Sequence, residues 1–272
     1  MRTLNVSLLL GLCLFLASCS MTATREEADA FMKLGDFEAA VAAYDRVIKL
    51  QPEDKYALSN RALSNEKLEN FDEAYTDYTK LIQMKFNTRK AYLGRARCSF
   101  ELENFEGAIF DANLVLKTEP DNLDASALRG RAYVKVGMTN DAITDLSRVL
   151  EKRPDDVQVL ISRGAAWTRG GVPTQGLKDF DRALKIAPNL PVAHFNKGVV
   201  FYMYENWDAA IENFDAALKV DPEYVEAYTR RGMSKLESSF HRVSGACDDF
   251  KKAKSLDRDD ELALGLIKGY CK

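Results

Sequence analysis

The chain reads Leu68-Glu-Asn-Phe-Asp-Glu-Ala-Tyr-Thr-Asp-Tyr78 and, 34 residues later, Leu102-Glu-Asn-Phe-Glu-Gly-Ala-Ile-Phe-Asp-Ala112. Small residues continue this spacing in both directions, at Ala40, Ala74, Ala108, Ala142, Gly176 and Ala210. Five prolines fall on the same grid, at Pro52, Pro120, Pro154, Pro188 and Pro222. Self-similarity at one fixed period predicts a chain built from stacked structural repeats.

Each repeat is predicted to be a pair of helices separated by a short turn such as Leu34-Gly35-Asp36. Small residues let the two helices approach closely. The grid proline ends the second helix, because proline lacks the backbone N–H that would continue it. One helix pair cannot bury its apolar face alone, so stacking of several pairs has to supply the core.

The pattern resembles the tetratricopeptide repeat (TPR) family, whose period is 34 residues. Position 8 of the repeat, where the family has a small residue, holds Ala28, Ala62, Ala96, Gly130, Gly164, Gly198 and Gly232. The resemblance implies an all-α solenoid of about seven helix pairs, capped by a helix at 259–272. The pairs are expected at 21–54, 55–88, 89–122, 123–156, 157–190, 191–224 and 225–258. The seventh pair contains a two-residue insertion around 238–245, so that the alanine expected at residue 244 lies at Ala246 instead.

The first 18 residues look like a bacterial lipoprotein signal. Arg2 precedes an apolar run from Leu8 to Ala17, which is shorter than the roughly twenty residues that span a membrane. The run ends in Leu16-Ala17-Ser18-Cys19, which resembles a lipobox. The resemblance implies that a diacylglycerol is attached to the Cys19 thiol and that cleavage before Cys19 leaves a mature chain with two or three acyl chains.

Residues 19–24 would then form the lipidated tether. Ser20 favours the outer membrane over the inner one, by resemblance to enterobacterial sorting rules. The alternative is an ordinary cleaved signal in which Cys19 is incidental. The sequence therefore predicts a lipid-anchored protein of the cell envelope, with the membrane face left open.

The composition excludes several classes of function. The chain has 38 basic and 41 acidic residues and a net charge of −3, whereas wrapping a nucleic-acid backbone needs a basic face. A hydrophobic content of 46% is typical of a folded chain rather than a disordered one. Only two histidines are present, and we expect no metal site and no cofactor.

Cysteine positions suggest one disulfide. Cys247 begins the last repeat helix and Cys271 ends the capping helix, at similar distances from the turn near Arg258-Asp259. Two antiparallel helices of equal length place these residues at the same height, and an envelope address permits a bond between them. The alternative is two buried free thiols. Cys98 lies mid-helix and is expected to be a small buried residue.

The search for catalytic chemistry finds little. His194 occupies position 4 of its repeat, a packing position, and His241 lies in the irregular loop without a nearby nucleophile pattern. The stretch Gly171–Lys178 resembles a phosphate loop only superficially, and the repeat grid explains it as a turn between helices. We therefore expect no enzyme activity; an enzyme subunit is the less favoured alternative.

The TPR resemblance implies a concave binding groove lined by the first helix of each repeat, at positions 2, 5, 9, 12 and 13. In the first four repeats these positions hold Arg25, Lys33, Lys67, Lys90, Arg97, Arg131 and Lys135. In the last three they hold Ile161, Val192, Phe195, Val199, Tyr202, Met203, Met233 and Leu236. The prediction is a groove with a basic N-terminal half for acidic segments and an apolar C-terminal half for an amphipathic helix or extended peptide.

The groove residues have two alternative interpretations. The apolar residues are, on one view, packed against their own repeats instead of open to a partner. A clamp for chaperone C-terminal carboxylates is disfavoured, because Asp29 stands where the clamp has an amide and Gly94 where it has a cation.

The sequence therefore predicts a non-catalytic adaptor that holds a second envelope protein or peptide. An assembly factor, either pilotin-like or for outer-membrane proteins, fits the same features. The identity of the partner and the oligomeric state stay open.

Overall fold

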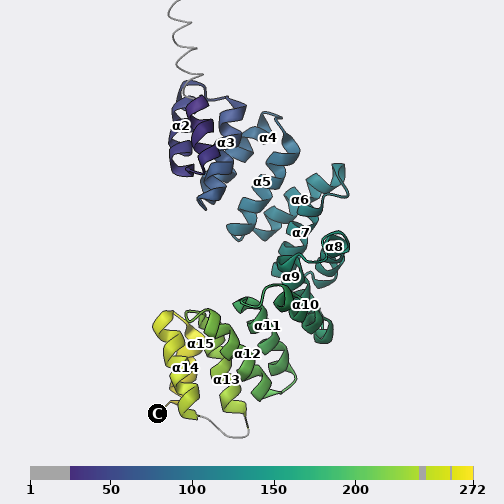
Figure 1. The fold of residues 1–272 in the computed structure, drawn as a ribbon, viewed down its shortest axis with the longest axis vertical. Coiled ribbons are helices and arrows are strands. Elements are labelled where there is room, and N and C mark those ends of the chain that lie inside the picture. The colour runs from purple at the N-terminus through teal and green to yellow at the C-terminus, as the bar shows by residue number, and fades with distance from the viewer. Residues whose placement is uncertain (1–24, 239–242, 258, 272) are drawn as a thin grey trace, which may run out of the picture. The chain divides into compact units, whose positions relative to one another are not determined.

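The computed structural model describes residues 25–238, 243–257 and 259–271 (Figure 1). These residues form α-helices joined by short turns, and no β-strand occurs among them. The predicted all-α architecture is confirmed. The proposed signal at 1–18, the lipidation site Cys19, the tether at 19–24 and His241 lie outside the described residues.

The helices come in pairs that follow the 34-residue grid. We call the first helix of a pair helix A and the second helix B. The pairs are 25–34 with α2 (Phe37–Leu50), α3 (Lys55–Lys67) with α4 (Phe71–Gln83), α5 (Thr88–Glu101) with α6 (Phe105–Thr118), α7 (Leu123–Val136) with α8 (Thr139–Lys152), α9 (Val157–Arg169) with α10 (Pro173–Ile186), α11 (Pro191–Met203) with α12 (Trp207–Val220), and α13 (Val225–Glu237) with α14 (Val243–Leu256). The cap α15 (Glu261–Tyr270) follows alone.

The chain divides into two compact units, Met1–Ala132 and Tyr133–Lys272. In the first unit each helix from α2 to α6 packs against the next one along the chain. In the second unit the same holds from α8 to α15. Each unit is therefore a stack of helix pairs in which neighbours in sequence are neighbours in space.

The turn between helices A and B has one backbone conformation in the first six repeats. Position 15 of these repeats is left-handed: φ is +78° at Gly35, +82° at Gly137 and +81° at Gly171. Glutamates take the same place at Glu69, Glu103 and Glu205, with φ of 60°, 58° and 58°. A residue with a side chain is strained there, because its Cβ crowds the backbone.

In the last three repeats, the core of each helix pair contains an aromatic ring packed on a glycine. Phe214 on α12 is fully buried, and a Cβ added to Gly198 on α11 would lie 2.6 Å from its ring. Gly232 stands in the same relation to Phe250, with a contact of 2.5 Å. The small residue at position 8 is therefore required by close approach, as the sequence pattern indicated.

A ladder of ion pairs, which the sequence analysis did not identify, ties the helices together. The cation at position 7 donates to an aspartate at position 23 of its own repeat: Arg61 to Asp77 and Arg163 to Asp179, both in paired bonds of 2.7 and 2.8 Å. The same cation also reaches position 25 of the preceding repeat, as in the 2.5 Å bond from Arg61 to Asp45. Each rung therefore joins three helices.

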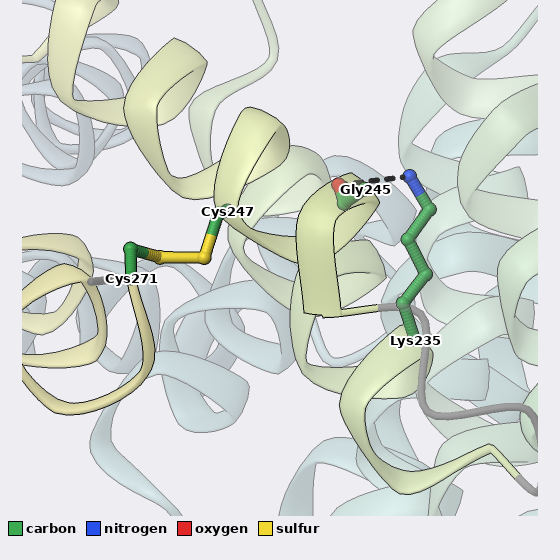
Figure 2. The surroundings of a disulfide bond; sticks show 4 residues. All are labelled: Lys235, Gly245, Cys247 and Cys271. Atoms are coloured by element: carbon green, nitrogen blue, oxygen red, sulfur yellow. Dashed lines mark hydrogen bonds between the residues drawn. A yellow bond between two sulfur atoms is a disulfide. The ribbon is translucent and has the colours of Figure 1, made fainter.

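The seventh repeat accommodates its insertion before α14. Ala246 and Phe250 are fully buried, at the places predicted for them. Lys235 on α13 donates from Nζ to the Gly245 carbonyl at 3.3 Å (Figure 2). It also pairs with Asp249 at 2.7 Å. These bonds attach the start of α14 to helix A.

The cap α15 shares a buried alanine with the A helix before it. Ala263 is fully buried, as Ala227 is at position 3 of the repeat before it. Cys247 and Cys271 are joined by a disulfide with a Cα–Cα distance of 5.6 Å (Figure 2). The structure therefore contains the predicted disulfide and not the alternative of two free thiols. Cys98 is free and buried.

Candidate functional site

The A helices form a continuous surface in each unit, which we call the helix-A face. In the first unit α3 contacts α5 directly, and in the second unit α11 contacts both α9 and α13. Side chains on adjacent A helices meet at a regular spacing: position 12 of one repeat lies beside position 9 of the next, 31 residues later, as in Glu66 and Arg97. This face carries the residues that the sequence analysis assigned to a groove.

In the first unit, acidic residues neutralise two of the predicted groove cations. Arg25 forms an ion pair with the buried Asp54. Arg97 donates from Nε and Nη2 to the two carboxylate oxygens of Glu66, at 2.7 and 3.0 Å. Burial disfavours the charged form of Arg97, but its bonds to Glu66 outweigh that effect and raise its pKa. The face is therefore less basic than the sequence suggested.

Four further predicted cations of this unit are exposed or lie over an aromatic ring. Lys90 is exposed. The guanidinium of Arg131 lies over the ring of Phe100, 4.4 Å from its centroid. Lys33 and Lys67 are also exposed on this face. The positive charge available to a ligand therefore comes from these residues rather than from Arg25 or Arg97.

A polar network holds Asp29 at the start of the face. The Tyr44 hydroxyl donates to Asp29 at 2.5 Å, and Asn60 Nδ2 donates to Asp29 at 3.2 Å and to the Tyr44 oxygen at 3.1 Å. Burial and the neighbouring carboxylate raise the pKa of Tyr44, which keeps its hydroxyl protonated. The two side chains that donate to Asp29 are thus residues of this unit itself.

In the second unit, the face around Tyr202 combines aromatic and other apolar side chains with a cation. The Tyr202 ring meets Trp207 edge to face at 5.0 Å between centroids, and the Arg230 guanidinium lies 5.9 Å from its centroid. Burial raises the pKa of Tyr202. Met203 is 51% exposed. The remaining predicted residues here are partly exposed, at Val192, Val199, Met233 and Leu236.

Two predicted groove residues belong to the packing instead. Ile161 is only 7% exposed. Phe195 packs against Phe214 at 5.6 Å and against Tyr224 at 4.9 Å between ring centroids. Both occupy position 5, and Phe195 meets the last residue of its own repeat, 29 residues later, as Arg25 meets Asp54. Position 5 therefore contacts the end of its own repeat, although the Arg25 side chain stays 42% exposed and Phe195 partly exposed.

The other residues considered for catalysis or phosphate binding lie in ordinary helices and turns of the repeats. His194 is partly exposed, and its Nε2 lies 3.0 Å from the Pro188 carbonyl oxygen. In the segment that resembled a phosphate loop, Gly171 is left-handed in the turn between α9 and α10, and residues 173–178 form the start of α10. Among the described residues, no group of three or more His, Cys, Asp or Glu side chains is arranged to hold a metal ion. The described helices are also too short or too polar to cross a bilayer.

Comparison with known families points to one family over more than half of the chain. A tetratricopeptide repeat profile matches residues 25–85 and 127–191, and a second tetratricopeptide repeat profile matches residues 191–224. Among curated proteins, none matches the chain significantly.

Solved structures share the fold at low sequence identity. A tetratricopeptide repeat protein from Parabacteroides merdae superimposes with a TM-score of 0.73 at 21% identity, covering 93% of this chain and 99% of its own. MamA from Desulfovibrio magneticus gives 0.54 at 20% identity, covering 64% of this chain and 98% of its own. YrrB, a TPR protein described as having an unusual peptide-binding site, gives 0.51 at 22% identity, covering 70% and 97%. At these identities the likeness shows the fold alone.

Proposed function

Because the chain belongs to the tetratricopeptide repeat family, we propose that it is a non-catalytic adaptor whose helix-A face binds a segment of another protein. The observation that carries the proposal is the apolar surface around Tyr202, Met203 and Met233 on α11 and α13. A cluster of apolar side chains on a protein surface marks an interaction site more often than isolated apolar side chains do. Methionines adapt to varied partner side chains, which suits a binding face.

The comparison with YrrB supports the binding of a peptide segment by this fold. That protein is described as having a peptide-binding site, and it shares the fold with this chain. Helical and extended peptides both dock in grooves by placing apolar side chains at regular intervals. The spacing of Met203 and Met233 on adjacent A helices offers such intervals.

We further propose that the mature chain is held at the cell envelope by acyl chains on Cys19, with the outer membrane as its site. Leu16-Ala17-Ser18-Cys19 supports the anchor, and Ser20 supports the outer membrane. The Cys247–Cys271 disulfide is compatible with this address, because structural disulfides persist in oxidising compartments such as the periplasm. Cys19→Ala is expected to move the protein from the membrane fraction to the soluble fraction.

The binding proposal is tested by capture from solubilised envelopes, followed by mass spectrometry. The test variant is Met203→Asp with Met233→Asp, which places charges on the open face. Phe195→Asp is unsuitable, because its ring is part of the packing. The matched control is Ile186→Asp, since Ile186 is 43% exposed but lies at the end of a B helix.

We expect a partner that is retained by the parent and the control and lost by the folded test variant. Circular dichroism checks that each variant is folded. A wall-remodelling partner would favour the adaptor role, and a secretin or outer-membrane protein would favour the assembly role. Equal retention by all three chains would contradict binding at this face.

A further inference from the structure

Arg131 is the residue on the first unit's helix-A face whose environment points to a ligand. Its guanidinium lies over the Phe100 ring at 4.4 Å, and Phe100 itself is 8% exposed and packed in the core with Leu128 and Ala132. The ring is therefore a fixed platform. Stacking on an aromatic face restrains the flexible arginine side chain while leaving its N–H groups at the edge of the guanidinium plane.

The equivalent residue one repeat earlier shows what such a guanidinium binds in this fold. Arg97 occupies position 9, as Arg131 does, and both side chains meet position 12 of the preceding repeat. At Arg97 the position-12 residue is Glu66, whose carboxylate receives two donors from the guanidinium. At Arg131 the position-12 residue is Phe100, which supplies a ring in place of a carboxylate.

The guanidinium N–H groups of Arg131 consequently lack such a carboxylate partner among the residues that the structure describes. Across residues 25–238, 243–257 and 259–271, no carboxylate forms an ion pair with Arg131. Exposed Lys67 and Lys90 on the same face add positive charge. An arginine fork binds carboxylates through two parallel hydrogen bonds, and a half-buried setting strengthens them.

Arg230 in the second unit is the weaker candidate for the same role. It lies farther from its ring, at 5.9 Å from the Tyr202 centroid. Glu226, Asp257 and Asp260 line a cavity of about 380 Å³ together with it. That acidic surrounding disfavours an incoming carboxylate.

We propose that Arg131, stacked on Phe100, receives a carboxylate of the bound segment, so that the first unit's helix-A face selects an acidic stretch of the partner protein. This inference rests on the proposed function, because it names the chemistry that the binding face prefers. It also assigns a specificity role to Arg131 and not to its neighbour Arg97, whose guanidinium is already paired with Glu66.

The test uses the full mature chain and an array of short synthetic peptides that vary in glutamate, glutamine, lysine and leucine content. Each glutamate peptide has a twin with glutamine in its place. We expect the parent to bind glutamate peptides at least about tenfold more tightly than their twins, as a filled bidentate pair provides. The preference should weaken as salt is raised.

Three variants separate the fork from general charge. Arg131→Gln is expected to bring the glutamate preference to within about twofold, while Arg131→Lys keeps the charge but retains only part of it. Arg46→Gln removes one positive charge from an exposed pair on helix B, away from this face. It is expected to keep the full preference.

The outcomes distinguish the inference from the function on which it rests. Peptide binding with no preference for glutamate, or with a preference that Arg131→Gln leaves intact, would overturn the role of Arg131 and leave the adaptor proposal standing. Equal losses in Arg131→Gln and Arg46→Gln would assign the effect to net charge and also overturn it. If no peptide binds the parent, the binding function fails and the inference fails with it.

Discussion

Arg231 donates from Nε to Asp249 at 2.9 Å, and the two residues are 18 apart in the chain. In earlier repeats the same bond joins residues 16 apart, as in Arg163 and Asp179. The difference of two residues is the insertion before α14. The seventh repeat therefore keeps the ion pair that the second, third and fifth repeats have, although two residues are inserted between its partners.

The ladder is expected to stabilise the fold chiefly by pairing carboxylates that would otherwise be buried alone. Asp179 is 8% exposed, so Arg163→Ala should lower the free energy of unfolding by about 3 kcal/mol. Arg182→Ala breaks a surface pair, with side-chain exposures of 48% and 71%, and should cost about 0–1 kcal/mol. Urea titration of both variants measures the difference, and equal losses would contradict the assignment.

The left-handed glutamates offer a stabilising change. Glu103 has φ of 58° in the turn where other repeats have glycine. Glu103→Gly should raise the free energy of unfolding by about 0.5–1 kcal/mol, because glycine adopts this conformation without Cβ strain. Glu106→Gly, in the first turn of α6, should instead lower it by about 1 kcal/mol. Thermal unfolding of the two variants checks the opposite signs; a lower melting temperature for Glu103→Gly would refute the strain argument.

The disulfide is expected to hold the cap on the last repeat. It closes a loop between residues 24 apart, and its removal in Cys247→Ala/Cys271→Ala should cost about 2–4 kcal/mol. Among residues of α15 only Ala263 is buried, so the loss should appear first as faster amide exchange in that helix. Hydrogen exchange measured by mass spectrometry tests this, with α11 as the internal reference. Unchanged protection of α15 would mean that packing alone retains the cap.

Cys98 is expected to be unreactive in the folded protein. Burial raises the pKa of its thiol from the usual 9.0 to about 12, so the thiolate that reacts with alkylating reagents is scarce at neutral pH. Iodoacetamide should modify Cys98 only after unfolding. Rapid alkylation of the native chain, detected by peptide mass, would contradict its burial.

The same shift has a consequence for stability at high pH. The thiol ionises at lower pH in the unfolded chain than in the folded one, so the unfolded state loses its proton first. The contribution of Cys98 to stability is thus full below pH 9.0 and falls as pH rises toward about 12. Cys98→Ala should flatten the decline of stability across this range. An identical decline in both chains would assign it to other groups, such as the tyrosines.

The 34-residue spacing of small and aromatic residues determined the helix pairs, their order and the capping helix, because these follow from local propensity and period. The equal heights of Cys247 and Cys271 followed from the same counting. A further regularity was present in the sequence, since Arg61 and Asp77, and Arg163 and Asp179, recur at one spacing. That signal would have identified the ladder.

Only the tertiary structure decided which helix-A side chains are open to a partner. Arg25 and Phe195 contact residues 29 positions later, and Arg97 is paired with a residue 31 positions earlier. Arg131 has the same repeat position as Arg97 and a different neighbour. The availability of a side chain depends on what lies across from it on the adjacent helix, and a single repeat viewed alone does not contain that information.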